Sequence, residues 1–291
     1  KGSLFPEVQH APFDGTTVPV QMSPDWVHLT SQEYKLPYNQ IPSDKLQSLP
    51  VYKPEELRTP VENLQWNNSQ HDLIRNAKIT FSVPYMGSYR LNGKEYDGSH
   101  SAVDVKVPEG TPVFSIANGV VIKVSNISSG FGKHVVIQHN NVPTLDDSSA
   151  QATLYSSYSH LSNIVATEGQ VVTKGQLIAQ SGATGFATTP HVHFQIDQSD
   201  APYHPYWPFT YKESADAGYN FVESINAGLG KERGILLTVA PMQYVQKYAG
   251  FSPSVPSVPA ESVPETSPEP SPEPVVPTAS LFEFQVNSSY L

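Results

Sequence analysis

The chain has 291 residues and contains no cysteine. It therefore has no disulfide framework and no thiolate metal site, which is compatible with a location outside the cytoplasm. It also lacks a basic run, and its formal net charge of −10 argues against nucleic acid as a partner. No apolar stretch approaches the length of a membrane span. The chain begins at Lys1, so its lack of a signal peptide is uninformative.

Histidine, by contrast, occurs in a pattern that carries chemistry. Three short segments, H-S-A-V-D (100–104), Y-S-H-L (158–161) and P-H-V-H-F (190–194), bring together His100, Asp104, His160, His191 and His193. A catalytic zinc site uses three protein ligands of these types and leaves a fourth position open for water. The sequence thus contains enough ligand residues for one such site, and further imidazoles beside them.

The spacing of these residues supports a shared site, because side chains on a strand alternate between the two faces. In 191–197 one face is apolar and the other is polar; the polar face consists of His191, His193, Gln195 and Asp197. In 100–107 the corresponding face consists of His100, Ala102, Asp104 and Lys106. Two such strands, each with an apolar reverse, can pair and converge on a metal ion. We prefer this interpretation to a sheet whose polar residues face water.

The base of such a site can be sought by elimination. Zinc-dependent hydrolysis needs a group that accepts a proton from water and a donor for the developing oxyanion. The helical motif H-E-x-x-H, which would provide a glutamate, does not occur. Glu109 and Glu168 lack its context, so imidazoles remain. His191 shares a face with His193, and His160 would approach from another strand; the sequence leaves open which imidazole is base and which is donor.

Five further segments accompany these three motifs. They are P-E-G-T-P-V (108–113), A-N-G-V-V (117–121), F-G-K-H-V-V-I-Q-H (131–139), G-Q-V-V-T-K-G-Q-L-I-A (169–179) and S-G-A-T-G (181–185). With them, residues 80–210 resemble the M23 metallopeptidases, the lysostaphin- and LytM-like zinc endopeptidases that cut peptide bridges in bacterial peptidoglycan. The resemblance covers less than half of the chain, and its motifs are specific in combination.

The resemblance implies a role for each of the five residues. His100, Asp104 and His193 would bind Zn2+, and His160 and His191 would be the catalytic imidazoles. It also implies a mainly β fold, namely a small antiparallel-sheet domain of the lysostaphin type (a duplicated hybrid motif) with a groove across it.

Two positions depart from the family pattern. Ala102 stands where glycine is usual within H-x-G-x-D, and Thr189 stands where glycine often precedes the proline of the last motif. Neither departure removes a ligand. The intact set favours an active enzyme over the alternative, a non-catalytic cell-wall-binding or amidase-activating module of the same fold.

Composition divides the chain into five regions. Residues 1–79, rich in Pro, Asn, Gln and Ser with scattered aromatics, predict an irregular N-terminal arm, and 80–210 predict the peptidase domain. Residues 211–250 predict two short helices, one from Asn220 to Gly228 and one from Pro241 to Gly250. Residues 251–279 predict a Pro/Ser/Glu-rich linker, of which 251–277 would reach about 80 Å in polyproline II. The alternation in 280–291 predicts the start of a further β domain.

Within 80–210, short runs between turn signals predict nine strands, at 78–85, 102–107, 112–116, 119–125, 134–139, 152–160, 170–173, 176–181 and 191–197. The segment 140–151 is long for a hairpin loop, and long ordered loops are often functional, so it is a candidate wall of the groove. A short helix is expected near 69–76.

Other residues receive weaker assignments. Gln195 is a candidate to support a metal ligand, although a solvated strand position is preferred. Tyr158 is expected to share a face with His160, where it either holds substrate or packs within the sheet. His134 and His139 are expected to be structural. Four histidines outside the motifs are expected at the surface, namely His10, His28, His71 and His204.

These patterns predict a zinc-dependent endopeptidase acting on peptidoglycan peptides outside the cytoplasm, whether secreted, periplasmic or at the cell surface. A peptidase for another, glycine-rich peptide is the second choice. We expect a monomer with no nucleic-acid partner. The arm has two interpretations: a latency segment that covers the zinc, or, preferred here, a structural wrap around the enzyme.

Overall fold

The computed structural model describes residues 10–59, 68–91 and 93–251. The chain divides into two units, Lys1–Pro253 and Ser254–Leu291, and the described residues all belong to the first. The predicted linker, beyond Phe251, and the predicted β segment at 280–291 lie outside the described residues. Within the described ranges, no helix is long and apolar enough to cross a membrane.

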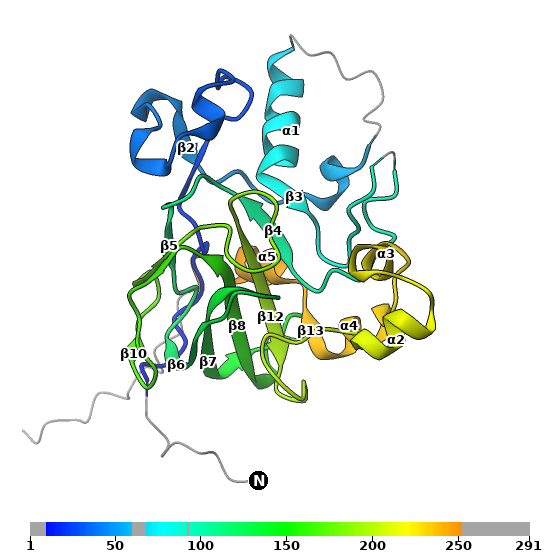
Figure 1. The fold of residues 1–291 in the computed structure, drawn as a ribbon. Coiled ribbons are helices and arrows are strands. Elements are labelled where there is room, and N and C mark those ends of the chain that lie inside the picture. Colours follow the sequence, from blue (N-terminus) through cyan, green and yellow to red (C-terminus); the bar gives the residue numbers. More distant parts are fainter. Residues whose placement is uncertain (1–9, 60–67, 92, 252–291) are drawn as a thin grey trace, which may run out of the picture. The chain divides into compact units, whose positions relative to one another are not determined.

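The main element of Lys1–Pro253 is an antiparallel sheet of eight strands (Figure 1). Its order is β10-β6-β7-β8-β12-β4-β3, and β13 pairs with the later residues of β12. The strands are β3 (Phe81–Val83), β4 (Val103–Lys106), β6 (Gly119–Asn126), β7 (Lys133–Pro143), β8 (Gln151–Leu161), β10 (Val171–Val172), β12 (His191–Gln198) and β13 (Thr238–Val239). The predicted pairing of the two histidine-bearing segments is confirmed, because β4 and β12 are neighbours.

Two smaller antiparallel sheets accompany the main one. One consists of β1 (Met22–Pro24) and β2 (Leu46–Ser48), and the other has the order β5 (Pro112–Phe114), β11 (Leu177–Gln180), β9 (Asn163–Ile164). The protein is therefore mainly β, as predicted.

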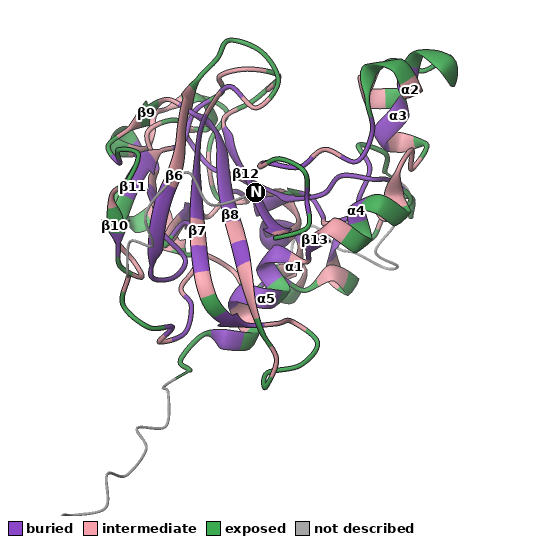
Figure 2. Ribbon diagram, turned by 90° about the horizontal axis from the view of Figure 1, so that it is seen from below, coloured by how far each residue is buried: buried purple, intermediate pink, exposed green. Residues whose placement is uncertain are grey.

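Burial explains why β12 lies within the sheet. Its apolar face, Val192, Phe194 and Ile196, packs into the hydrophobic core, and each of these side chains contributes about 1.5–3 kcal/mol by leaving water. Its opposite face, which carries the histidines, is buried as well. Figure 2 shows the same burial along much of the neighbouring strands. A strand covered on both faces holds its side chains in fixed positions, as a metal site requires.

All nine predicted strand segments contain an observed strand, but two boundaries are wrong. The strand predicted from residue 78 starts later, because α1 (Ser69–Thr80) continues to Thr80. This helix starts at Asn68, whose side chain accepts a hydrogen bond from the backbone N–H of Gln70. It includes the helix predicted at 69–76.

The second wrong boundary concerns the segment 140–151. β7 continues to Pro143 and β8 begins at Gln151, so the connection is shorter than predicted. The connection contacts α5 (Pro241–Tyr248): the Lys247 ammonium donates to the Leu145 carbonyl, and the Tyr248 hydroxyl donates to the Thr144 carbonyl, both at 2.6 Å. No residue of 140–151 lines the cavity described below, so the prediction of a groove wall is wrong.

Four helices follow β12 in the described part of the chain, where two were predicted. They are α2 (Tyr211–Asp216), α3 (Phe221–Asn226), α4 (Lys231–Leu237) and α5. α3 and α5 were predicted; α3 begins at a capping box formed by Asn220 and Glu223. α2 was missed although Thr210 and Glu213 form a second capping box, because six residues show too little periodicity. In Figure 1, α2, α3 and α4 lie together at one side of the sheet.

The described part of the arm packs onto the rest of the unit. Besides β1 and β2 it contains four single turns of 3-10 helix, at Glu33–Lys35, Tyr38–Gln40, Ser43–Lys45 and Pro54–Leu57. Tyr52 packs edge-on against Phe81 with ring centroids 5.1 Å apart, and the Thr17 N–H donates to the Ile116 carbonyl at 2.8 Å. None of residues 10–59 lines the cavity at the site. These contacts agree with a structural wrap rather than a latency segment.

Candidate metal and active site

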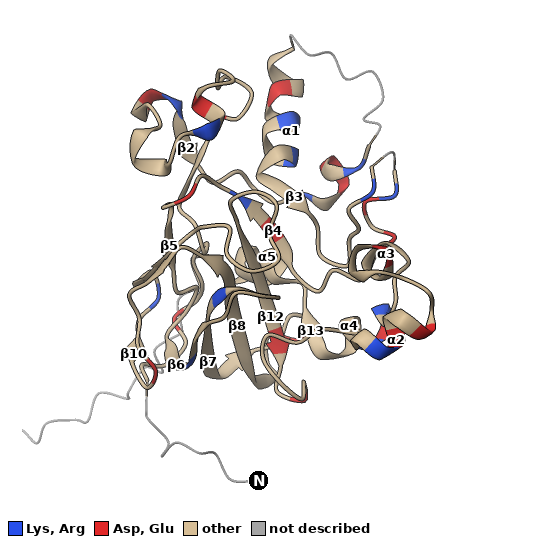
Figure 3. Ribbon diagram, viewed as in Figure 1, with Lys and Arg blue, Asp and Glu red and all other residues tan. Residues whose placement is uncertain are grey.

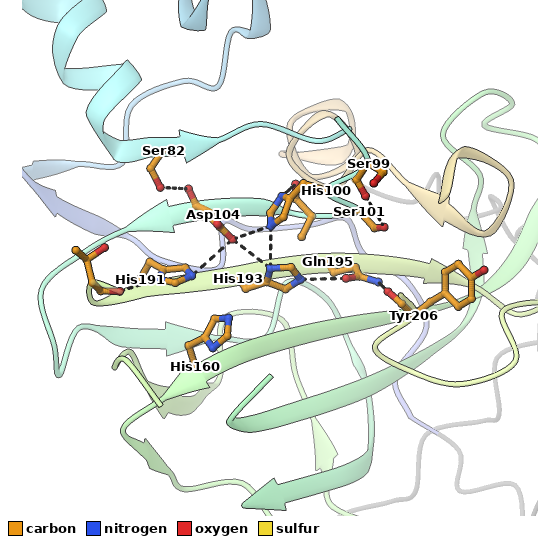
Figure 4. A network of polar contacts seen from close by, with 12 residues as sticks. Ser82, Ser99, His100, Ser101, Asp104, His160, His191, His193, Gln195 and Tyr206 are labelled. Atoms are coloured by element: carbon orange, nitrogen blue, oxygen red, sulfur yellow. Dashed lines mark hydrogen bonds and ion pairs between the residues drawn. The ribbon is translucent and has the colours of Figure 1, made fainter. Parts of the chain in front are cut away.

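Three of the predicted residues converge where β4 and β12 meet (Figure 4). The register places His193 directly opposite Asp104, while His100 lies just before β4 and bridges to Gly87. His193 Nδ1 lies 3.1 Å from Asp104 Oδ1 and 3.2 Å from His100 Nε2, and His100 Nε2 lies 3.3 Å from Asp104 Oδ1. All three residues are buried, so the donors form a triangle inside the protein.

Hydrogen bonds on the far side of each ring determine which nitrogens form this triangle. His100 Nδ1 donates to the Ala102 carbonyl at 2.9 Å, and His193 Nε2 donates to Gln195 Oε1 at 3.1 Å. The lone pairs of His100 Nε2 and His193 Nδ1 therefore face one another and the Asp104 carboxylate. Three electron-rich atoms this close repel unless a cation lies between them, so the donor set fits a metal ion.

The charges at the triangle respond to burial and to each other. Burial acts to raise the pKa of Asp104, but His100 and His191 outweigh it and hold that pKa well below its ordinary value. Burial lowers the pKa of His193, so its ring is held neutral. An ionised Asp104 carboxylate and a neutral His193 imidazole are the protonation states in which these two groups bind a metal ion.

A buried polar chain supports His193 from behind. The Gln195 amide nitrogen donates to Asp197 Oδ1 and to the Tyr206 carbonyl, which forces Gln195 Oε1 toward His193. Asp197 Oδ2 in turn accepts from the Tyr206 N–H and pairs with His204 Nδ1, both at 3.0 Å. Gln195 is fully buried, so its preferred assignment as a solvated residue is wrong. The surface assignment of His204 is wrong too, because its ring stacks on Tyr155 and meets Asp197.

The two remaining imidazoles lie beside the triangle. The rings of His160 and His191 have centroids 4.7 Å apart, and His191 Nε2 is 3.7 Å from Asp104 Oδ1. His191 Nδ1 donates to the Thr189 carbonyl at 2.7 Å, and His160 Nδ1 donates to the Thr184 carbonyl at 2.8 Å. Each ring therefore keeps an unprotonated Nε2. Burial, with help from His191 and His193, lowers the pKa of His160 to about 3, so that ring is neutral near pH 7.

Backbone conformation at His160 corrects the expectation for Tyr158. His160 has a left-handed φ of 62°, which breaks the alternation of β8, so the two side chains do not share a face. Tyr158 instead lies in the core, tilted against Phe194 at 5.5 Å, and its hydroxyl accepts from the Ile116 N–H. Of its two interpretations, packing is correct and substrate contact is wrong.

The other histidines lie outside the triangle. His134 and His139 are buried and bond to backbone carbonyls, as expected for structural residues. His28 is exposed as predicted, whereas His10 and His71 are half-buried.

A cavity of about 830 Å³ opens over the five predicted site residues, all of which line it. Aromatic side chains form one wall. The Phe131 ring lies 5.5 Å from that of His193 and 5.8 Å from that of Trp207, and Trp207 stacks on Phe221 at 5.0 Å. This wall was not predicted, because Trp207 and Phe221 occur in no motif and only the fold brings them to the site.

A buried His-Asp-His triangle and two imidazoles at one cavity, on an antiparallel sheet, define a centre of the metallopeptidase class. Residues 98–205 match Peptidase family M23, and the chain belongs to this family.

Several characterised proteins are similar to the chain. The peptidoglycan DD-endopeptidase ShyA of Vibrio cholerae is 39% identical over 97 residues, which is 33% of this chain and 20% of ShyA. The glycyl-glycine endopeptidase ALE-1 of Staphylococcus capitis is 30% identical over 172 residues, 58% of this chain and 43% of ALE-1. The lysostaphin catalytic domain from Staphylococcus simulans is 32% identical, with 40% of this chain and 78% of that chain covered and a TM-score of 0.31. The chain thus spans less than half of the length of these two curated relatives.

Proposed function

We propose that the protein is a zinc-dependent endopeptidase that hydrolyses peptide bonds in bacterial peptidoglycan. The observation that carries the proposal is the triangle formed by His100 Nε2, Asp104 Oδ1 and His193 Nδ1, with edges of 3.1 to 3.3 Å. Tetrahedral zinc with bonds of about 2.0–2.1 Å places its ligands about 3.3–3.4 Å apart. The three donors therefore already stand close to the spacing that zinc requires, and the cavity lies over them.

The residues of the chain divide into ligands and proton carriers. Zinc, when bound, supplies a Lewis acid and lowers the pKa of a coordinated water. His191 and His160 each present an unprotonated Nε2 beside the ligands, so either ring can accept a proton at that atom. Once protonated, the same nitrogen can donate to an oxyanion or to the leaving amine. His191 Nε2 lies 3.7 Å from Asp104 Oδ1, next to the ligands.

The relatives support the choice of substrate. ShyA and ALE-1 are named as endopeptidases, one of them for peptidoglycan and one for glycyl-glycine bonds. A peptidoglycan substrate supports a location outside the cytoplasm. The presence of all five site residues in one cavity supports an enzyme over a non-catalytic wall-binding or amidase-activating module.

The proposal is tested by measuring zinc content and hydrolysis on the same samples. His193→Ala should lose most of its zinc, whereas His160→Ala and His191→Ala should retain zinc and lose turnover by about 100-fold or more. The exposed His28→Ala is the matched control and should behave as the wild type. The mass of fragments released from purified peptidoglycan identifies the bond. Well-folded protein without zinc, or full turnover in both imidazole variants, would contradict the proposal.

A further inference from the structure

The aromatic wall continues the metal triangle outward in one unbroken row. Phe131 contacts the ring of His193, Trp207 contacts Phe131, Phe221 stacks on Trp207, and Phe186 meets Phe221 edge-on at 5.0 Å. Trp207 and Phe221 follow the residues matched to Peptidase family M23, which end at 205. The C-terminal helical region therefore completes this wall, through Phe221 of α3.

The outer end of the cavity also carries apolar side chains that face solvent. Tyr211 is 83% exposed and Phe186 is 55% exposed, although large apolar side chains usually leave water. Both line the cavity, as do the exposed side chains of Leu91, Ile127 and Tyr203. Exposed apolar residues gathered around a pocket mark a binding site rather than a random surface.

The cavity has little charge with which to recognise a polar ligand. Apart from histidine, Arg90 and Asp104 are the only charged residues in its lining as described, and Asp104 belongs to the metal triangle. Figure 3 shows the same scarcity on the strands around the site, where most of the ribbon is tan. The part of the ligand that fills this wall is therefore apolar.

We propose that the wall is a side-chain subsite for a residue next to the scissile bond, and that this residue carries an alkyl chain of several carbons. The inference rests on the proposed function, because the metal triangle and the wall share one cavity: a peptide held at the metal has its neighbouring side chain beside Phe131 and Trp207. Leucine has the required chemistry, and so does the alkyl stem of a diamino acid in a peptidoglycan peptide. A glycine bridge has no side chain to bury there.

The test uses zinc-loaded full-length protein and two fluorogenic peptides that differ only in Gly or Leu beside the cleaved bond. We expect kcat/KM for the Leu peptide to exceed that for the Gly peptide by about 10-fold or more, the usual discrimination by an apolar pocket. Phe186→Ala and Tyr211→Ala should lower kcat/KM for the Leu peptide and thereby remove most of this preference. Both side chains are exposed, so these variants should fold. Tyr219→Ala, an exposed aromatic outside the cavity, is the matched control.

Binding is measured separately by the change in tryptophan fluorescence during titration with N-acetyl-leucine amide; Trp207 contributes to this signal alongside Trp26 and Trp66. Saturable binding that weakens in Phe186→Ala but not in Tyr219→Ala supports the subsite, even if no peptide is cleaved; in that case only the proposed function fails. Equal kcat/KM for both peptides, or equal losses in all three variants, overturns the subsite while leaving the proposed function intact. Crosslinked stem peptides with a diamino acid and pentaglycine then distinguish the two natural sources of substrate.

Discussion

At the scale of single residues, the site depends on hydrogen bonds that decide which imidazole nitrogen is free. The two ring nitrogens of the triangle are free to bind a metal ion, because a carbonyl oxygen accepts a hydrogen bond from the other nitrogen of each ring and so keeps the proton there. For His100 that oxygen belongs to the backbone of Ala102, so a side chain in place of the usual glycine does not disturb it. For His193 the oxygen belongs to Gln195 and needs support of its own. The site therefore extends beyond its three ligands.

This dependence predicts the effect of changing Gln195 or Asp197. Gln195→Ala removes the acceptor for His193 Nε2, and Asp197→Asn allows the Gln195 amide to turn, so both should weaken zinc binding by about 10- to 100-fold. Chelator competition measures the affinity, and the ring nitrogen shifts of His193 report its tautomer. Gln138→Ala, a half-buried glutamine on β7, is the control. Unchanged affinity together with an unchanged tautomer would mean that the Gln195 and Asp197 side chains only fill space.

A second residue-scale prediction concerns His139 and acid stability. Burial lowers the pKa of His139 to about 4, so the folded state keeps this ring neutral after the unfolded chain has begun to bind protons near its ordinary value of 6.5. Its stabilising effect is therefore complete above pH 6.5 and is lost as pH falls toward 4, by about 3 kcal/mol at most. Between pH 7 and pH 4, the free energy of unfolding measured in urea should decline less steeply for His139→Gln than for the wild type. Parallel profiles for the two proteins would argue against this assignment.

Residue-scale features were predictable where alternation alone decided them. His193, Gln195 and Asp197 share a face because β12 is regular, and the pairing with β4 follows from the same pattern. The prediction placed His160 on the wrong face relative to Tyr158, because the alternation of side chains does not reveal a left-handed φ at a non-glycine residue. Burial of both faces of β12 also could not be seen, since it depends on the segment that covers the polar face.

At the scale of elements, the sequence predicted the existence of strands more reliably than the residues at which they begin and end. β7 and β8 extend past the polar residues that suggested a long loop, because tertiary contacts with α5 hold the extra residues. α2 and α4 were not predicted for the opposite reason: helices of six and seven residues are too short to show a sustained apolar period. The wall of the cavity comes partly from this poorly predicted region, which is why the site was only partly foreseen.

The N-terminal arm should contribute to the stability of the fold through Tyr52. Tyr52 is buried against Phe81, and its N–H donates to the side chain of Gln246 on α5, so the arm ties β3 to the last helix. Tyr52→Ala should lower the free energy of unfolding by about 3–5 kcal/mol, as for other large aromatic truncations, and leave turnover per folded molecule unchanged. Tyr52→Phe, which keeps the ring, is the control in denaturant unfolding. An increase in turnover of Tyr52→Ala would instead favour a latency role for the arm.

At the scale of the whole molecule, the metal triangle joins parts of the sequence that lie far apart. His100 and Asp104 precede β5 to β11 in the chain, and His193 follows them, so a bound ion closes a loop through most of the main sheet. The ion binds the folded state and finds no preformed triangle in the unfolded chain. Metal binding and folding should therefore be coupled across the entire unit rather than confined to the site.

Removal of the metal should reveal this coupling as a loss of stability. Free zinc at 100 times its Kd stabilises the folded state by about 2.7 kcal/mol, so adding EDTA should lower Tm by several degrees and restoring zinc should recover it. His193→Ala should melt at the same temperature with or without zinc, because it has lost a corner of the triangle. His28→Ala, changed at an exposed histidine remote from the metal, should respond as the wild type does. If the wild type melted identically in zinc and in EDTA, the triangle would not bind zinc in solution.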